Sequence, residues 1–247
     1  MNAAELRILP DLKALAGAAA AELLQAARGV TLQAGRFTVA LAGGQTPRST
    51  YQVLARSPQA GDGLLRWETW EVFFSDERPV PPHHAESNFR MVRETLLANG
   101  RIPLAHVHRI QGELDPPQAA DLYEADLRQS FGLAPGQPPR FDLILLGLGT
   151  DGHTASLFPG TSALAEQRRW VCASWVPKLQ SHRVTLTLPV LNAAAEVIFL
   201  VSGKEKAEVL RAVLHGQGAG DRLPAQLVRP HSGRLLWLAD AAAASLL

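Results

Sequence analysis

The stretch Phe141-Asp-Leu-Ile-Leu-Leu-Gly-Leu-Gly-Thr-Asp-Gly-His-Thr-Ala-Ser-Leu-Phe-Pro159 decides the fold. Its first six residues form an almost continuous apolar run, which is typical of a parallel strand that is buried on both faces. Glycines and polar side chains follow directly. In α/β proteins, ligands bind beyond the carboxyl ends of such strands. The stretch therefore predicts a buried central strand that ends at a ligand site.

Similar apolar runs and helical patterns alternate on both sides of this stretch. We expect further strands at 36–42, 69–74, 184–188, 197–201 and 235–238, and helices at 12–27, 48–56, 87–98, 115–131 and 205–214. Gly29 is interpreted as the stop signal of the first helix, and the alanines at 241–244 suit a terminal helix. Because parallel neighbours need crossover segments that are usually helical, the alternation predicts an α/β fold with a mostly parallel, doubly wound sheet flanked by helices.

Length and composition restrict the class of protein. The 247 residues are 47% hydrophobic and 19% charged, which predicts one folded domain over 1–247. A net charge of +1 argues against nucleic acid and membrane surfaces as partners, and no apolar window is long enough to span a bilayer. The only cysteine, Cys172, lies in an apolar run, where a buried structural role is the commoner one. We expect a cytoplasmic protein with a small-molecule partner.

The segment Gly43-Gly44-Gln45-Thr46-Pro47 follows the expected strand at 36–42. Two glycines permit a sharp turn, and a proline can occupy the first position of a helix. The free N–H groups and the dipole at a helix start attract an anion such as phosphate. The alternative interpretation is a simple strand-to-helix turn with a threonine cap.

Two cations stand at other strand ends and can complete a phosphate site. Arg183 precedes the strand at 184–188, and Lys204 follows the strand at 197–201 in Ser202-Gly203-Lys204. Two cations balance the charge of a phosphate monoester, and backbone amides donate hydrogen bonds to its oxygens. A solvated lysine at a helix start is the competing interpretation of Lys204.

Asp151-Gly152-His153 is the strongest candidate for chemistry. A histidine with a pKa of about 6.5 can serve as a general base near neutral pH, and the adjacent aspartate favours a functional role. Gly147 to Gly152 also matches the dinucleotide fingerprint G-x-G-x-x-G. That match is discounted because Pro159 leaves room for barely two helical turns, whereas the fingerprint opens into a long helix.

Asp76-Glu77-Arg78 is the second acid–base candidate, because it follows the strand at 69–74. Arg78 can polarise a carbonyl or bind an oxyanion, and Asp76 can orient a hydroxyl group or a cation. A charged surface loop is the alternative. Ser87-Asn88 is interpreted first as a helix cap. The histidines have no spacing that argues for a metal site, so no metal is expected.

Taken together, these segments resemble the 6-phosphogluconolactonase family, within the larger group that includes glucosamine-6-phosphate deaminases. The residues that carry the resemblance span 43–207, and the most specific segment is Gly149-Thr-Asp-Gly-His-Thr-Ala-Ser-Leu-Phe-Pro159. The others are Gly43 to Arg48, Ser75 to Arg78 with Val80-Pro81 and Ser87-Asn88, Arg183 to Pro189 with Leu191-Asn192, and Ser202 to Lys204 with Lys206-Ala207.

The resemblance implies a Rossmann-like fold, no cofactor, and hydrolysis of 6-phospho-D-glucono-1,5-lactone to 6-phospho-D-gluconate in the oxidative pentose phosphate pathway. It implies that His153 activates water and that Arg78 holds the substrate or its oxyanion. Asp76 and Asp151 would orient Arg78, His153 or sugar hydroxyls. The 6-phosphate would be held by the loop Gly43, Gly44, Gln45 and Thr46 together with Arg183 and Lys204.

Three other functions remain as alternatives. A glucosamine-6-phosphate deaminase and isomerase belongs to the same group, although the segments around Arg78 and His153 resemble the lactonase pattern more closely. A non-catalytic sugar-phosphate sensor would bind without turnover. A nicotinamide-dependent dehydrogenase rests only on the discounted fingerprint. The sequence does not set the oligomeric state, and a monomer is compatible with it.

Overall fold

The computed structural model describes residues 4–57, 66–134, 136–216 and 222–247. The predicted domain 1–247 therefore includes short stretches outside the described residues. At the centre is a six-stranded parallel sheet with the strand order β1-β9-β8-β5-β2-β3. Its strands are β1 (Glu5–Leu9), β2 (Phe37–Leu41), β3 (Trp70–Phe74), β5 (Leu143–Gly147), β8 (Glu196–Val201) and β9 (Arg234–Asp240).

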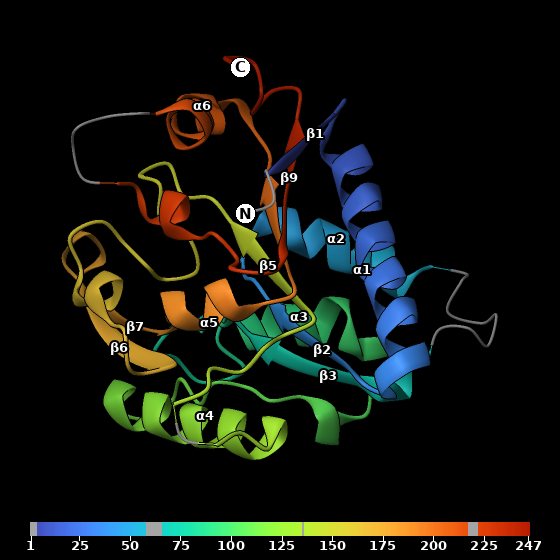
Figure 1. Cartoon of the computed structure of the whole chain (residues 1–247), viewed down its shortest axis with the longest axis vertical. Helices are drawn as coiled ribbons and strands as arrows, with labels where there is room; N and C mark the ends of the chain where they lie inside the picture. Colours follow the sequence, from blue (N-terminus) through green and yellow to red (C-terminus); the bar gives the residue numbers. More distant parts are fainter. Residues whose placement is uncertain (1–3, 58–65, 135, 217–221) are drawn as a thin grey trace.

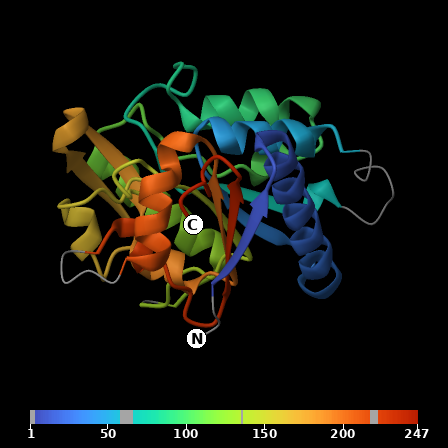
Figure 2. The same cartoon turned by 90° about the horizontal axis from the view of Figure 1, so that it is seen from above.

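Helices cover both faces of this sheet, so the molecule has three layers (Figures 1 and 2). One face carries α1 (Leu12–Ala34), α2 (Gln45–Ala55) and α3 (Asn88–Thr95), and the other carries α4 (Pro116–Phe131), α5 (Leu188–Ala193) and α6 (Ala207–His215). The 3-10 helices are η2 (Trp67–Thr69), η3 (Leu97–Asn99), η4 (Leu104–His106), η5 (Ser162–Ala165), η6 (Pro177–Leu179), η7 (Lys204–Lys206) and η8 (Pro224–Leu227). The predicted Rossmann-like, doubly wound α/β fold is confirmed.

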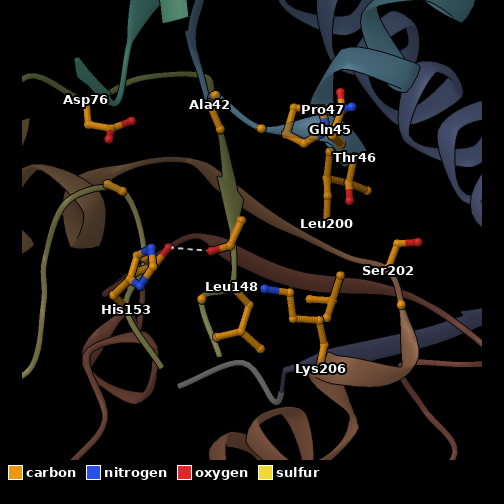
Figure 3. A pocket seen from close by; sticks show the side chains of 18 of the residues that line it. Ala42, Gln45, Thr46, Pro47, Asp76, Leu148, His153, Leu200, Ser202 and Lys206 are labelled. Atoms are coloured by element: carbon orange, nitrogen blue, oxygen red, sulfur yellow. Dashed lines mark hydrogen bonds between the residues drawn. The ribbon is translucent and has the colours of Figure 1, made fainter. Parts of the chain in front are cut away.

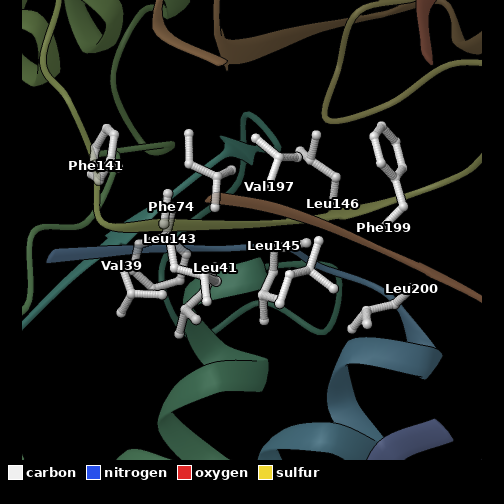
Figure 4. Close-up of a cluster of buried hydrophobic side chains, with 14 of the residues drawn as sticks. Val39, Leu41, Phe74, Phe141, Leu143, Leu145, Leu146, Val197, Phe199 and Leu200 are labelled. Atoms are coloured by element: carbon white, nitrogen blue, oxygen red, sulfur yellow. The ribbon is translucent and has the colours of Figure 1, made fainter. Parts of the chain in front are cut away.

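The hydrophobic core lies on both sides of the central strands. Every side chain of β2 is buried, as are the four apolar residues of β5, Leu143 to Leu146. Figure 4 shows Phe141, Leu146 and Phe199 projecting to one face of the sheet, while Val39 and Leu145 project toward the helices of the other face. The continuous apolar run around position 143 thus has the predicted cause, burial on two sides.

A second, smaller sheet stands beside the first and contains three antiparallel strands. Its order is β4 (Asp76–Glu77), β7 (Ser181–Leu186) and β6 (Val171–Val176). The strand predicted at 184–188 belongs to this sheet, and β6 lies where the sequence analysis placed no strand. Cys172 lies on β6 and packs against the core, and burial raises the pKa of its thiol to about 11, in keeping with a structural role.

Several element boundaries differ from the sequence-based expectation. Gly29 does not end the first helix, because an exposed helical glycine costs only about 1 kcal/mol. It ends instead before Gly35, which has a φ of 78°. The alanines at 241–244 form turns rather than a helix, tied to Asp240 by the backbone N–H of Ala243. Of the helices in the described ranges, none has the length and apolar character required to traverse a bilayer.

Candidate active site

A cavity of about 510 Å³ opens at the carboxyl ends of the central strands. It lies where the chain connections diverge, between β2, which leads to β3, and β5, which leads toward β8 and β9. Such a switch point is where open α/β sheets bind ligands. The walls come mainly from the segments that follow β2, β5 and β8, together with Asp76 and Arg78.

The loop after β2 presents the free end of α2 to this cavity. The helix begins at Gln45, with Gly44 at the N-cap (φ 101°, ψ 171°), and no side chain caps it. Pro47 is therefore its third residue rather than its first, and the threonine-cap interpretation is wrong. The backbone N–H groups of Gln45 and Thr46 have no partner within the helix, and both residues line the cavity.

Gly43 must be a glycine at its position. A Cβ atom there would lie 2.8 Å from Nδ2 of Asn88 and closer still to the amide oxygen. Asn88 is buried and donates to the backbone oxygen and to Oδ1 of Asp76, at 3.0 and 3.1 Å. The close approach thus joins the loop after β2 to the segment that carries Asp76.

His153 lines the cavity and is held through one ring nitrogen. Its Nδ1 lies 2.5 Å from Oδ1 of Asp151, and Nζ of Lys178 lies 2.8 Å from Oδ2 of the same carboxylate. Burial raises the pKa of Asp151, but the hydrogen bonds from Lys178 and His153 outweigh it and the net pKa is well below the usual range. An ionised carboxylate only accepts, so Nδ1 donates and Nε2 of a neutral imidazole carries the lone pair. Among the described residues, Nε2 has no hydrogen-bond partner.

Two neighbours fix the plane of the imidazole ring. The Phe158 ring stacks on it at a centroid distance of 4.0 Å and an angle of 22°. On Gly149 a Cβ atom would lie 2.7 Å from Cγ of His153, so only glycine leaves room for the ring. The loop itself is closed by the backbone N–H of Gly149, which donates to the carbonyl of His153 at 2.8 Å.

Asp76 and Arg78 line the cavity from β4 and the residue that follows it. Asp76 is buried, and its Oδ2 accepts a 2.6 Å hydrogen bond from the Ser156 hydroxyl. Ser156 belongs to the same segment as His153, so this bond connects the two acid–base candidates. The sequence analysis did not assign Ser156 a role, because nothing in a serine three residues after a histidine indicates a partner 80 positions away.

Glu77 has a structural role between these two residues. Its Oε1 accepts from the backbone N–H groups of Arg78 and Asn88, and its Oε2 accepts from Ser87 Oγ and the Phe89 N–H, at 2.8 to 3.0 Å. Burial raises the pKa of its carboxyl group against the effect of these bonds. The Ser87 hydroxyl caps α3 by accepting from the Arg90 N–H, which confirms the predicted cap.

The cationic side chain at the far wall is Lys206. Figure 3 shows its ammonium group pointing into the cavity, with Gln45, Thr46 and Ser202 on the same side, while His153 and Asp76 lie opposite. Lys204 does not line the cavity, because η7 (Lys204–Lys206) turns it outward to solvent. The loop before it is held by Asp240, which accepts from the Ser202 hydroxyl and the Gly203 N–H.

Arg183 also stands apart from the cavity lining. Its Nη1 donates to the carbonyl oxygen of His182 at 2.7 Å, and burial together with the nearby positive charge of Arg78 lowers its pKa. Of the ten predicted site residues, seven line the cavity, and Asp151 supports His153 from behind. Within the described ranges, no three His, Cys, Asp or Glu side chains are arranged to hold a metal ion.

A protein family matches this chain over nearly its whole length. The family described as glucosamine-6-phosphate isomerases/6-phosphogluconolactonase covers residues 10–237. The chain belongs to this family. A 6-phosphogluconolactonase of Nostoc sp. is 38% identical over 96% of this chain and 95% of its own length. A Homo sapiens 6-phosphogluconolactonase is 44% identical over 94% of this chain and 89% of its own.

The fold agrees with that of a solved family member. The structure of 6-phosphogluconolactonase from Trypanosoma brucei superposes with a TM-score of 0.88 and 29% identity, over 100% of both chains. The two chains therefore share their fold from end to end. The predicted membership is confirmed by these similarities.

Proposed function

We propose that the protein hydrolyses 6-phospho-D-glucono-1,5-lactone to 6-phospho-D-gluconate, the lactonase step of the oxidative pentose phosphate pathway. One observation carries the proposal: His153, oriented by Asp151, faces across a single cavity toward the uncapped start of α2 and Lys206. A base and an anion site on opposite walls suit a substrate with a carbonyl at one end and a phosphate at the other. The 6-phosphogluconolactonase relatives support the same reaction.

His153 is the general base in this proposal. Its Nε2 removes a proton from water while the water oxygen attacks the lactone carbonyl carbon, and Asp151 stabilises the resulting imidazolium. When the tetrahedral intermediate collapses, the ring C–O bond breaks and Nε2 returns the proton to the ring oxygen. The product is the open-chain acid, and His153 is neutral again.

Arg78 stabilises the oxyanion that develops on the carbonyl oxygen. Its guanidinium lines the cavity and is oriented by a hydrogen bond from Nη1 to the carbonyl of Glu86. A fixed cation in a partly desolvated site stabilises charge better than mobile water does. Asp76, held by Ser156 and Asn88, is placed to accept from sugar hydroxyls and to balance Arg78.

The phosphate binds to the loop Gly43, Gly44, Gln45 and Thr46. The free N–H groups at the start of α2 donate to its oxygens, and Lys206 supplies a positive charge on the same wall. The geometry supports Lys206 here in place of Lys204. The predicted contribution of Arg183 stays a prediction, since Arg183 lies beside Arg78 and outside the lining.

The test is a lactone-disappearance assay on freshly generated substrate, corrected for spontaneous hydrolysis. The wild-type protein should accelerate hydrolysis, and His153→Ala should lower kcat by about 10² to 10⁴, the usual contribution of a general base. His153→Ala should still bind 6-phosphogluconate in calorimetry, because the phosphate contacts lie on the other wall. No acceleration by the wild type, ammonia release from glucosamine 6-phosphate, or binding without turnover would overturn the proposal.

Two lysines of one short helix provide a matched pair for the phosphate site. Lys206→Met should raise KM with little change in kcat, because it removes binding that is common to the ground and transition states. Lys204→Met removes the same charge two positions away and should change KM far less. Equal effects of the two substitutions would contradict the assignment of Lys206.

The remaining expectations accompany this proposal. We infer a single domain over 1–247, supported by one hydrophobic cluster whose members run from Leu15 to Ala244. The reaction as written needs no cofactor or metal, because the base and the oxyanion donor are side chains. Action in the cytoplasm and the monomeric state stay predictions.

A further inference from the structure

Lys178 lies at the tip of the β6–β7 hairpin and does not line the cavity. It lies in η6, within the connection from β6 to β7, and its Nζ donates to Oδ2 of Asp151 at 2.8 Å. The two residues are 27 positions apart. The tip of the hairpin is thus fastened to the loop that carries His153.

The two oxygens of Asp151 have different partners. Oδ1 faces Nδ1 of His153, and it also lies 3.3 Å from the His153 backbone nitrogen, which donates to it. Oδ2 faces Lys178. A carboxylate held at one oxygen can rotate about its side-chain bonds, whereas one held at both keeps a single orientation.

The hairpin that presents Lys178 is a rigid support. Strands β6 and β7 pair in register from Val171↔Leu186 to Val176↔Ser181. On its other edge β7 pairs with β4, where Asp76 lies opposite Thr185. Lys178 therefore reaches Asp151 from the same sheet that carries Asp76.

We propose that Lys178 is a positioning residue for the reaction: its ammonium group holds the Asp151 carboxylate in the orientation that directs Nε2 of His153 into the cavity. This inference rests on the proposed lactonase function for its kinetic consequences. The side chain of Lys178 is 64% exposed, against 22% for Asp151, so the contact is partly screened by water. Removal of Lys178 should therefore lower kcat less than removal of His153.

Lys178→Met should lower kcat about two- to fivefold, the change expected from one partly exposed ion pair, with KM nearly unchanged. Lys178→Arg keeps the charge and should restore most of the rate. Lys13→Met, on the exposed side of α1, removes the same charge elsewhere and should leave kcat and KM unchanged. A lower kcat in the Lys13 variant, or no rescue by arginine, would contradict a specific role.

A double-mutant cycle separates positioning from general stabilisation of the fold. In an Asp151→Asn background the carboxylate that Lys178 holds is gone, so adding Lys178→Met should lower kcat no further. Additive losses in the cycle would overturn the inference, because they would show that Lys178 acts without Asp151.

The pH profile supplies a second readout. Without Lys178 the Asp151–His153 pair takes up a proton more easily, so the acidic limb of kcat/KM should move to higher pH by about half a unit. The other charged groups of the cavity, Asp76, Arg78, Glu205 and Lys206, are the same in both proteins. An unmoved limb would contradict the proposal.

An NMR measurement tests the inference independently of turnover. Long-range proton–nitrogen spectra of the imidazole, with the His153 signals identified by their loss in His153→Gln, should change tautomer balance or line width in Lys178→Met but not in Lys13→Met. If the wild type lacks lactonase activity, this spectrum still decides the role of Lys178. If the wild type is active and the spectra are identical, only the inference about Lys178 fails.

Discussion

Replacing Gly149 with alanine should inactivate the protein without unfolding it. The added Cβ atom would lie 2.7 Å from Cγ of His153 and nearer to Nδ1 and Cε1, whereas ordinary contact begins at 3.4 Å. The backbone of Gly149 is fixed by its hydrogen bond to the His153 carbonyl, so the ring must retreat by more than about 1 Å to restore ordinary contact. The stacked Phe158 ring also restricts the directions in which the imidazole can move.

The size of the effect follows from that displacement. A shift of about 1 Å lengthens the 2.5 Å contact between His153 and Asp151 beyond ordinary hydrogen-bond distance. Misplacement of a catalytic group by about 1 Å can cost about 10²-fold in rate. Because the His153 side chain is 31% exposed, the ring can swing outward, and we expect at most about 1–2 kcal/mol loss of unfolding free energy.

The assay compares Gly149→Ala with Gly29→Ala, which makes the same chemical change on the exposed surface of α1, where nothing lies within 4 Å. We would measure kcat at saturating lactone, affinity for 6-phosphogluconate, and urea denaturation for both variants. Gly149→Ala should retain product binding and its fold while losing about two orders of magnitude in kcat. A kcat within threefold of the wild type would refute the argument that the glycine makes room for the imidazole.

Three further predictions concern stability. Burial opposes charge on His108, but hydrogen bonds of 3.0 Å to Asp126 and Glu71 raise its pKa above 6.5. The contribution of His108 to the unfolding free energy is therefore complete below about pH 6.5 and is lost as the pH rises through the higher folded-state pKa. In urea titrations, the destabilisation caused by His108→Gln should be ~1 kcal/mol larger at pH 6 than at pH 9. An equal destabilisation at the two pH values would argue against the charged pairings. Glu77→Gln should cost about 1–3 kcal/mol of unfolding free energy, since an amide group cannot accept all four hydrogen bonds, and a neutral result would show that these bonds are replaceable. Gly29→Ala should raise the unfolding free energy by about 0.5–1 kcal/mol in the same titrations, whereas a decrease would mean that the helix needs a glycine there.

The buried strands and the loops after them could be predicted from sequence because burial leaves a local signal, whereas the order of strands in the sheet and the largely exposed β1 could not. The run at 141–146 shows burial on two faces in its composition, and the glycines after it show where the backbone must turn. Of the small sheet, the sequence predicts only the strand at 184–188, because β4 and β6 lack such a signal. Strand β4 has only two residues, and the six residues of β6 form neither a fully buried run nor a strict alternation of buried and exposed side chains.

The sequence predicted which loops form the candidate site, but not in every case which residue of a loop lines the cavity. Lys204 and Lys206 are both close to a strand end, and only the conformation of η7 decides which one enters the cavity. The contacts of Ser156 with Asp76 and of Lys178 with Asp151 join residues 80 and 27 positions apart. Such pairs depend on tertiary packing, which leaves no periodic pattern in a single sequence.

Both sheets contribute residues to the walls of the cavity. The proposed phosphate-binding residues follow β2 and β8 of the large sheet, whereas Asp76 and Arg78 belong to β4 and the residue after it, and Lys178, which contacts Asp151, belongs to the β6–β7 hairpin. Protein engineers can exploit this modularity. Redesign of Gln45 and Thr46 for a different anionic group, with Gly43 kept for its close approach to Asn88, should leave His153, Asp76 and Arg78 in place, so affinity and turnover can be evolved as nearly independent traits.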